Sequence, residues 1–183
     1  MGRARAEAIL DPLDRAVYAI AGPLELVAQT FAVARGPGRF HRAGEPGVWY
    51  ACAALDGALA EVAFHQRRWL AASGLAGITV RLVEARAAFA GRFLDLRDAS
   101  HPALDAEIAV GWPAGQALAD QARAQRLDGI VWPSVRDPAR GEAYALLDRH
   151  GVRAPRWGET WRLSLGAAPS PPVADEPLIA PPA

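Results

Sequence analysis

The sequence contains one cysteine and no lysine, and both shortages narrow the chemistry available to it. The single thiol, Cys52, cannot form an intramolecular disulfide, which predicts a reducing compartment, the cytoplasm. Cys52 stands in an apolar segment and is expected to be a small buried side chain. Because all 20 Lys and Arg side chains are arginine, lysine nucleophiles and Schiff-base chemistry are excluded.

A basic excess and a long apolar run are also missing. The formal net charge is 0, whereas proteins that bind nucleic acid through phosphates usually carry an excess of cations. No apolar run approaches the roughly 18 residues that a membrane span requires. We therefore expect neither direct nucleic-acid binding nor a membrane partner. The 183 residues are 51% hydrophobic, which is enough for one domain with a packed core.

The pattern of apolar residues divides the chain into a lead-in at 1–14, a domain at 15–165 and a proline-rich, extended tail at 166–183. Helical spacing predicts helices at 56–72 and 114–126, whereas 24–34 fits a helix or a strand. Strands are expected at 15–20, 48–53, 78–84, 93–96, 129–132, 144–147 and 160–165. Strands and helices do not alternate regularly, so we predict a single α+β domain with a mostly antiparallel, split sheet and flanking helices.

The helix at 56–72 carries the first candidate functional residue. Asp56 is a plausible N-cap, and Ser73-Gly74 should end the helix. Glu61 stands near its apolar side, where a carboxylate is costly without a partner. It is either a surface residue that pairs with His65 or Arg68, or a functional carboxylate. Glu61 and His65 also have the spacing of two metal ligands, but further ligands are missing, so no metal is predicted.

Three other residues are candidates for a binding site. Arg39 lies in a glycine-rich turn and is either a phosphate ligand or a solvated loop residue. Tyr50, in an apolar strand, fits packing with one hydrogen bond or stacking on a ligand ring. Ser134 follows a buried strand and Pro133, without a G-x-S-x-G elbow, so it is a turn residue or a hydrogen-bond donor rather than a nucleophile.

In their order along the chain, these segments resemble the RES family of bacterial toxins, which is named after Arg, Glu and Ser. The resemblance spans roughly 15–165 and is carried by Gly38-Arg39-Phe40-His41, Trp49-Tyr50, Ala58-Leu59-Ala60-Glu61 with His65, Asp95-Leu96, Gln116, and Val131-Trp132-Pro133-Ser134-Val135-Arg136. By motif position, the family's functional residues fall on Arg39, Tyr50, Glu61 and Ser134.

The resemblance implies a fold similar to that of ADP-ribosyltransferases and NAD+ as the substrate. It implies an enzyme that cleaves the nicotinamide–ribose bond and transfers ADP-ribose to a protein, phosphate or water. It further implies a toxin of a type II toxin–antitoxin pair, with an antitoxin, often of helix-turn-helix type, covering the active site. The alternative is a non-catalytic module that binds a dinucleotide or a partner protein.

The side chains suit this chemistry. Cleavage gives the ribose oxocarbenium character, which a carboxylate such as Glu61 can stabilise. Arg39 would hold the pyrophosphate, Tyr50 would contact the nicotinamide, and Ser134 would fix a polar edge of the substrate.

Overall fold

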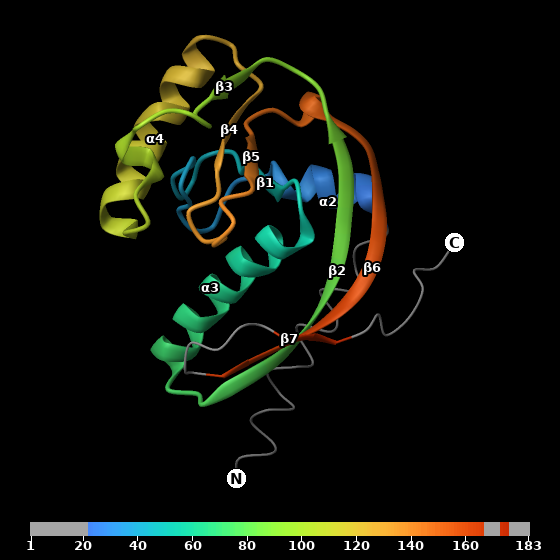
Figure 1. The fold of residues 1–183 in the computed structure, drawn as a ribbon. Coiled ribbons are helices and arrows are strands. Elements are labelled where there is room, and N and C mark those ends of the chain that lie inside the picture. Colours follow the sequence, from blue (N-terminus) through green and yellow to red (C-terminus); the bar gives the residue numbers. More distant parts are fainter. Residues whose placement is uncertain (1–21, 167–172, 176–183) are drawn as a thin grey trace.

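The computed structural model describes residues 22–166 and 173–175. The lead-in and the strand predicted at 15–20 lie outside the described residues. The described part contains three α-helices, two single-turn 3-10 helices and two β-sheets, which confirms the predicted α+β class. Figure 1 shows the smaller strands enclosed by helices on one side and by a long, curved pair of strands on the other.

The first sheet has the order β1-β5-β4-β3 and forms the centre of the domain. Only β3 and β4 run parallel, and the other neighbours are antiparallel. Ile130 and Ala145 at its middle are completely buried. The strands are β1 (Trp49–Cys52), β3 (Phe93–Asp95), β4 (Gly129–Pro133) and β5 (Glu142–Leu146).

The second sheet, in the order β2-β6-β7, is entirely antiparallel. Its strands are β2 (Gly77–Phe89), β6 (Val152–Gly166) and β7 (Val173–Asp175). β2 and β6 are much longer than predicted, because register shifts at 83–85 and 86–88 interrupt the alternation that sequence patterns detect. Three residues of the proline-rich tail form β7 and pair with β6, so the tail is not wholly separate from the sheets.

Helix α3 (Leu55–Ser73) packs against the second sheet through Ala63 and Leu70, which meet Leu163 and Leu165 of β6. The helix begins one residue earlier than predicted. Its N-cap is Ala54, so Asp56 is not the cap but an acidic residue in the first turn. The predicted end is correct, because Gly74 adopts the left-handed conformation (φ 67°) that commonly terminates helices.

Helix α4 (Ile108–Ala124) covers the first sheet and begins six residues before the predicted start at 114. The predicted start is too late in the chain because Pro113 is typical of a helix boundary, yet Pro113 lies inside the helix and leaves one carbonyl without its usual donor. The side chain of Glu107 caps the true N-terminus by accepting from the backbone N–H of Ala109.

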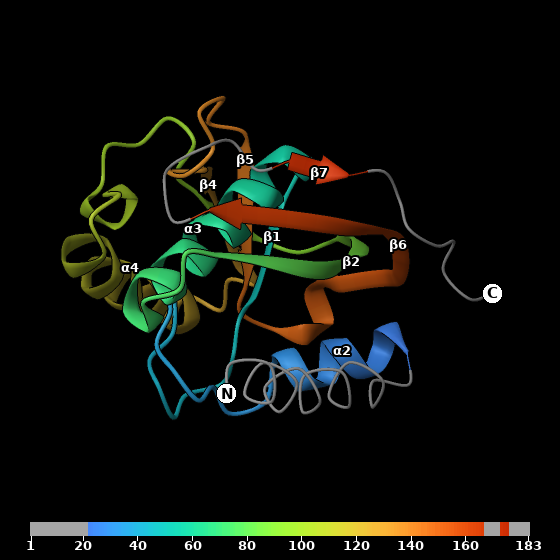
Figure 2. The same cartoon turned by 90° about the horizontal axis from the view of Figure 1, so that it is seen from below.

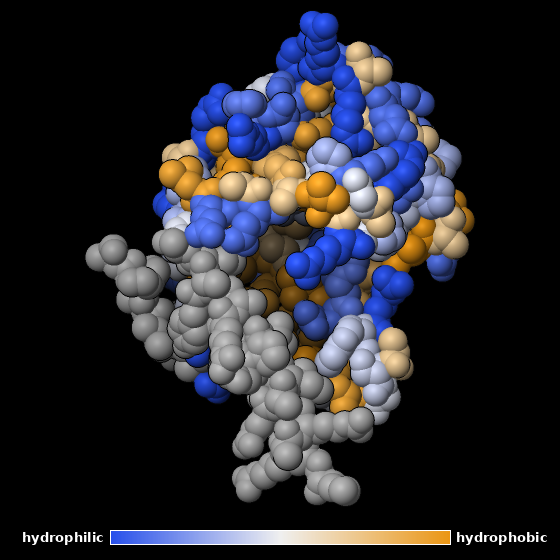
Figure 3. Space-filling view, turned by 180° about the vertical axis from the view of Figure 1, so that it is seen from behind, coloured by the Kyte–Doolittle hydropathy of each residue, from blue (hydrophilic) through white to orange (hydrophobic). Residues whose placement is uncertain are grey.

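The ambiguous segment at 24–34 contains helix α2 (Pro23–Thr30), which starts at a proline as helices often do. Val27 of α2 packs with Trp49, Leu146 and Val152, and Figure 2 shows the helix beside the turn into β6. No helix within the described residues is long and apolar enough to cross a membrane. From behind, the surface is mostly hydrophilic, and hydrophobic residues gather in a central hollow (Figure 3).

Candidate active site

The structure joins Glu61 and Ser134 directly. Glu61 lies on α3, and Ser134 follows the last residue of β4. The Ser134 hydroxyl donates a hydrogen bond of 3.2 Å to Oε1 of Glu61, and Ser134 is completely buried. The alternative of a surface glutamate paired with His65 or Arg68 is therefore wrong, because the partner of Glu61 is a buried serine across the domain.

The turn after β4 holds the Ser134 hydroxyl in place. Ser134 Oγ accepts hydrogen bonds from the backbone N–H groups of Arg136 (3.3 Å) and Asp137 (3.2 Å). The Asp137 carboxylate in turn accepts from the N–H groups of Ala139 and Gly141, at 2.9 and 3.1 Å. Ser134 is thus a turn residue and a partner of Glu61 at once. Asp137 had no role in the sequence analysis, although Ser-x-x-Asp before a proline is a recognisable turn signal.

Arg39 is buried, with 7% of its surface exposed, so the alternative of a solvated loop arginine is wrong. Its Nη1 donates to the backbone carbonyls of Ala103 and Asp105, the latter at 3.0 Å. Two glycines of α4 make room for it. A Cβ at Gly111 would lie 2.7 Å from Arg39 Nη1, and one at Gly115 would lie 2.4 Å from the Arg39 carbonyl oxygen.

Tyr50 is packed and hydrogen-bonded, and its ring is also partly exposed. Its hydroxyl accepts a hydrogen bond of 2.9 Å from the backbone N–H of Phe40 and lies 3.1 Å from Nδ1 of His41. The side chain also stacks on the buried Phe40 ring. Since 41% of the Tyr50 surface remains exposed, part of the ring is still available to a ligand.

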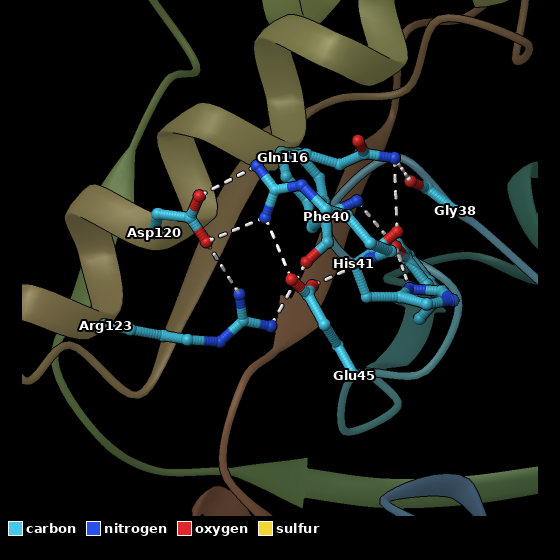
Figure 4. Close-up of polar contacts among 9 residues, drawn as sticks. Gly38, Phe40, His41, Glu45, Gln116, Asp120 and Arg123 are labelled. Atoms are coloured by element: carbon cyan, nitrogen blue, oxygen red, sulfur yellow. Dashed lines mark hydrogen bonds and ion pairs between the residues drawn. The ribbon is translucent and has the colours of Figure 1, made fainter. Parts of the chain in front are cut away.

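A polar network fastens the loop that carries Arg39 to helix α4 (Figure 4). Gln116 Nε2 donates to the carbonyls of Gly38 and His41, at 3.0 and 3.2 Å. Farther along the same loop, Arg42 forms an ion pair of 2.9 Å with Asp120. The position of Arg39 therefore depends on a helix that lies more than 70 residues away in sequence.

Burial and neighbouring charges shift the pKa values of two of the candidate residues. Burial raises the pKa of Glu61, while the Ser134 hydrogen bond and the charges of Arg136 and Arg39 oppose this effect. Burial also raises the pKa of Tyr50, which is further affected by the charges of Arg39 and Glu61. The charge of Arg39 thus acts on both Glu61 and Tyr50.

A second group of side chains adjoins Glu61 on α3. The guanidinium carbon of Arg136 lies 3.5 Å from the centre of the Phe64 ring. The His65 ring meets Phe64 edge-on, and burial together with three arginine charges lowers the pKa of His65. Sequence analysis had assigned no role to Phe64 or Arg136. Within the described ranges, no group of three or more His, Cys, Asp or Glu side chains could hold a metal ion.

Two open depressions of the surface lie elsewhere. One is at the end of the β2–β6 ladder, around Gly77 and Gly166, and the other lies beside β3, around Phe93 and Arg97. Neither is lined by Glu61 or Ser134, and the ionisable side chains of the second, Asp95, Arg97 and Tyr144, already pair with one another or with Glu142. The chemistry of the side chains therefore favours the Glu61 region as the candidate active site.

The family model of the RES domain matches residues 14–166 of this sequence. The chain belongs to the RES-domain family. A relative from Mycobacterium tuberculosis, named a probable NAD(+) phosphorylase, is 37% identical over 110 residues. This alignment covers 57% of the present chain and 51% of the relative, so the match spans about half the length of that protein.

The four RES motif residues are linked by the contacts described above. Glu61 and Ser134 share a hydrogen bond, and Arg39 lies within electrostatic range of Glu61 while its Nη1 is occupied by backbone carbonyls. Tyr50 is tied to the residue that follows Arg39. The structure thus brings all four together, and their roles in binding or catalysis stay predictions.

Proposed function

We propose that this RES-domain protein is an enzyme that cleaves NAD+ at the nicotinamide–ribose bond and transfers the ADP-ribosyl group to an acceptor, either a protein, phosphate or water. The observation that carries the proposal is the half-buried Glu61 carboxylate, held by Ser134 and flanked by two arginines. The name of the Mycobacterium tuberculosis relative supports NAD+ as the substrate and phosphate as one acceptor.

Glu61 is the group that would stabilise the reaction's positive charge. As nicotinamide leaves with the bonding electron pair, the ribose carbon gains oxocarbenium character. A carboxylate that is already desolvated interacts strongly with such a charge, because little solvent has to reorganise during the reaction. The acceptor oxygen then forms the new bond to this carbon and loses its proton, or carries none when it is phosphate.

The other residues would bind and orient the dinucleotide. The exposed part of the Tyr50 ring offers an aromatic surface to nicotinamide, while its hydroxyl fixes the ring to the loop. Among the described residues, Nε and Nη2 of Arg39 have no hydrogen-bond partner, so they remain for an anionic group. Ser134 holds the Glu61 carboxylate in one orientation.

The test is incubation of the purified protein with NAD+ in phosphate-free buffer, in phosphate buffer, and with candidate acceptor proteins. Nicotinamide release is measured by chromatography, and transfer of ADP-ribose to phosphate or protein by mass spectrometry. Nicotinamide should appear with the wild-type protein and disappear with Glu61→Gln. Saturable NAD+ binding without nicotinamide release would instead support the non-catalytic binding module.

The proposal includes a toxin role and a protein antitoxin that covers the site, both of which rest on the RES-family membership. Consumption of NAD+ would arrest growth, so induced expression should stop cell division while Glu61→Gln should not. A partner that covers the site should abolish nicotinamide release when the two proteins are copurified from the native operon. Growth unaffected by a protein that is active in vitro would contradict the toxin role.

A further inference from the structure

The two arginines beside Glu61 differ in how available they are to a ligand. Arg39 is 7% exposed, and its Nη1 is committed to carbonyls of the loop before α4. Arg136 is only half-buried, and within the described residues its guanidinium donates one hydrogen bond, from Nη2 to the carbonyl of Ala106, at 2.5 Å. Its remaining nitrogens therefore keep their donor capacity, which can serve two oxygens of one anion.

Arg136 is also held rigidly in place before any ligand binds. Its guanidinium carbon lies 3.5 Å from the centre of the Phe64 ring, a contact that restrains the group. Its backbone N–H donates to Ser134 Oγ, which in turn donates to Glu61. Arg136 thus belongs to the same turn as the candidate active site, and ordering its side chain costs little on binding.

In the part of the chain that the structure describes, the positive charge of Arg136 has no direct counterion. Among the described residues, no carboxylate lies within the 4.0 Å of an ion pair with its guanidinium, although Glu61 and Glu107 act on it from farther away. Arg68 adds a second positive charge nearby, 6.0 Å from the same Phe64 ring. A half-buried cation without an ion-pair partner, next to another cation, favours an anionic ligand.

We propose that Arg136, stacked on Phe64, is a phosphate-binding residue of this site. The inference rests on the proposed function, which supplies two sources of the same chemistry, the diphosphate of NAD+ and the inorganic phosphate acceptor. Arg39, which the sequence favoured for this contact, then mainly positions its own loop, in which the backbone N–H of Phe40 donates to the Tyr50 hydroxyl. Arg136 contacts the phosphate oxygens and keeps the reacting groups near Glu61.

The decisive variant is Arg136→Met, which removes the charge and retains much of the length that covers Phe64. Arg140→Met is the matched control, because Arg140 is an exposed arginine of the same turn whose backbone N–H, rather than its side chain, bonds to Asp137. Nicotinamide release is measured against NAD+ concentration with and without phosphate, and against phosphate concentration at saturating NAD+. Equal melting temperatures establish that each variant is folded.

The two phosphate sources give different results. If Arg136 binds the diphosphate, Arg136→Met raises the KM for NAD+ about 10- to 100-fold, the loss expected for hydrogen bonds to a charged group, even in phosphate-free buffer. If it binds the acceptor, only the KM for phosphate rises, and hydrolysis in phosphate-free buffer is unchanged. A lower kcat with both KM values unchanged would overturn the proposal and leave Arg136 a positioning residue.

Two further measurements separate this inference from the proposed function. Should the wild type release no nicotinamide, the proposed function fails, and calorimetric titration of NAD+ and of inorganic phosphate still compares the wild type with Arg136→Met. Equal affinities would then reject the inference. Should Arg136→Met not fold, Arg136→Lys retains the charge but loses the flat stack and the paired donors, and an unchanged KM for both NAD+ and phosphate would count against Arg136 as the phosphate ligand.

Discussion

Ser134 Oγ lies 3.2 Å from the Glu61 carboxylate, across 73 residues of sequence. This contact joins the middle of helix α3 to the end of strand β4. It gives the half-buried carboxylate one side-chain donor. The positive charges of Arg136 and Arg39 also oppose the effect of burial on the pKa of Glu61. Glu61 is thus desolvated enough to interact strongly with a cation, while the Ser134 hydrogen bond and the arginine charges stabilise its ionised form.

Replacing Glu61 by Gln should lower the rate of nicotinamide release about 100- to 1,000-fold, the range seen when one preorganised electrostatic group is removed. The KM for NAD+ should change much less, because the amide keeps the shape and the hydrogen-bonding oxygen. Glu159→Gln on β6 is the control, since Glu159 is exposed and its backbone N–H, rather than its carboxylate, bonds to Glu84. Retained activity in Glu61→Gln would contradict the assigned role.

Glu61→Gln should also change the dependence of stability on pH. Because burial raises the folded-state pKa of Glu61, the folded protein prefers the protonated acid. This stabilisation is complete below the unfolded-state pKa and is lost as the pH rises through the folded-state pKa. Glu61→Gln cannot ionise, so its melting temperature should exceed that of the wild type at neutral pH, and the gap should narrow in acid. Thermal unfolding of both proteins from pH 4 to 8 measures this difference in melting temperature. A difference that grows in acid would contradict the prediction.

Ser134→Ala should destabilise the fold by about 1–3 kcal/mol, the cost of leaving buried polar groups without partners. The substitution removes the acceptor for the N–H groups of Arg136 and Asp137 and the donor to Glu61. Ser164→Ala removes an exposed hydroxyl that bonds with Thr79 and should cost less. Urea unfolding compares the two variants, and equal losses would mean that the turn does not depend on Ser134.

Gly115→Ala should destabilise the protein and weaken activity, although alanine normally stabilises a helix by about 1 kcal/mol over glycine. The new Cβ would lie 2.4 Å from the Arg39 carbonyl oxygen, a backbone atom that cannot move without shifting the loop. Gly36→Ala is the control, because a Cβ there meets no atom within 4 Å. The melting temperature and the KM for NAD+ measure the losses of stability and activity. A Gly115→Ala variant more stable than the wild type would show that the loop moves to accommodate the new Cβ.

Cys52 should react slowly with thiol reagents in the folded protein. Burial, with smaller contributions from Glu61 and Asp137, raises its pKa to about 11. At pH 8 only about 0.1% of such a thiol is the reactive thiolate. Reaction with a chromogenic disulfide should therefore be slow in buffer and fast in denaturant. Equal rates in the two conditions would show that Cys52 is not protected.

The sequence by itself determined much of the local structure. Strands at 48–53 and 129–132, the helix ended by Gly74, and the α+β class all follow from apolar spacing and termination signals that act within a few residues. The order of Arg39, Tyr50, Glu61 and Ser134 was sufficient to indicate the RES family. These features depend on neighbours along the chain or on motif order, which a sequence displays directly.

Only the tertiary structure decided which side chains meet. Arg39 is buried because glycines of α4, more than 70 residues away, allow the close approach, and Glu61 depends on a serine from another element. Local sequence patterns likewise did not predict the full lengths of β2 and β6 or the contact of Arg136 with Phe64. The physical reason is that burial and long-range hydrogen bonds arise from packing between distant elements, which local periodicity does not encode.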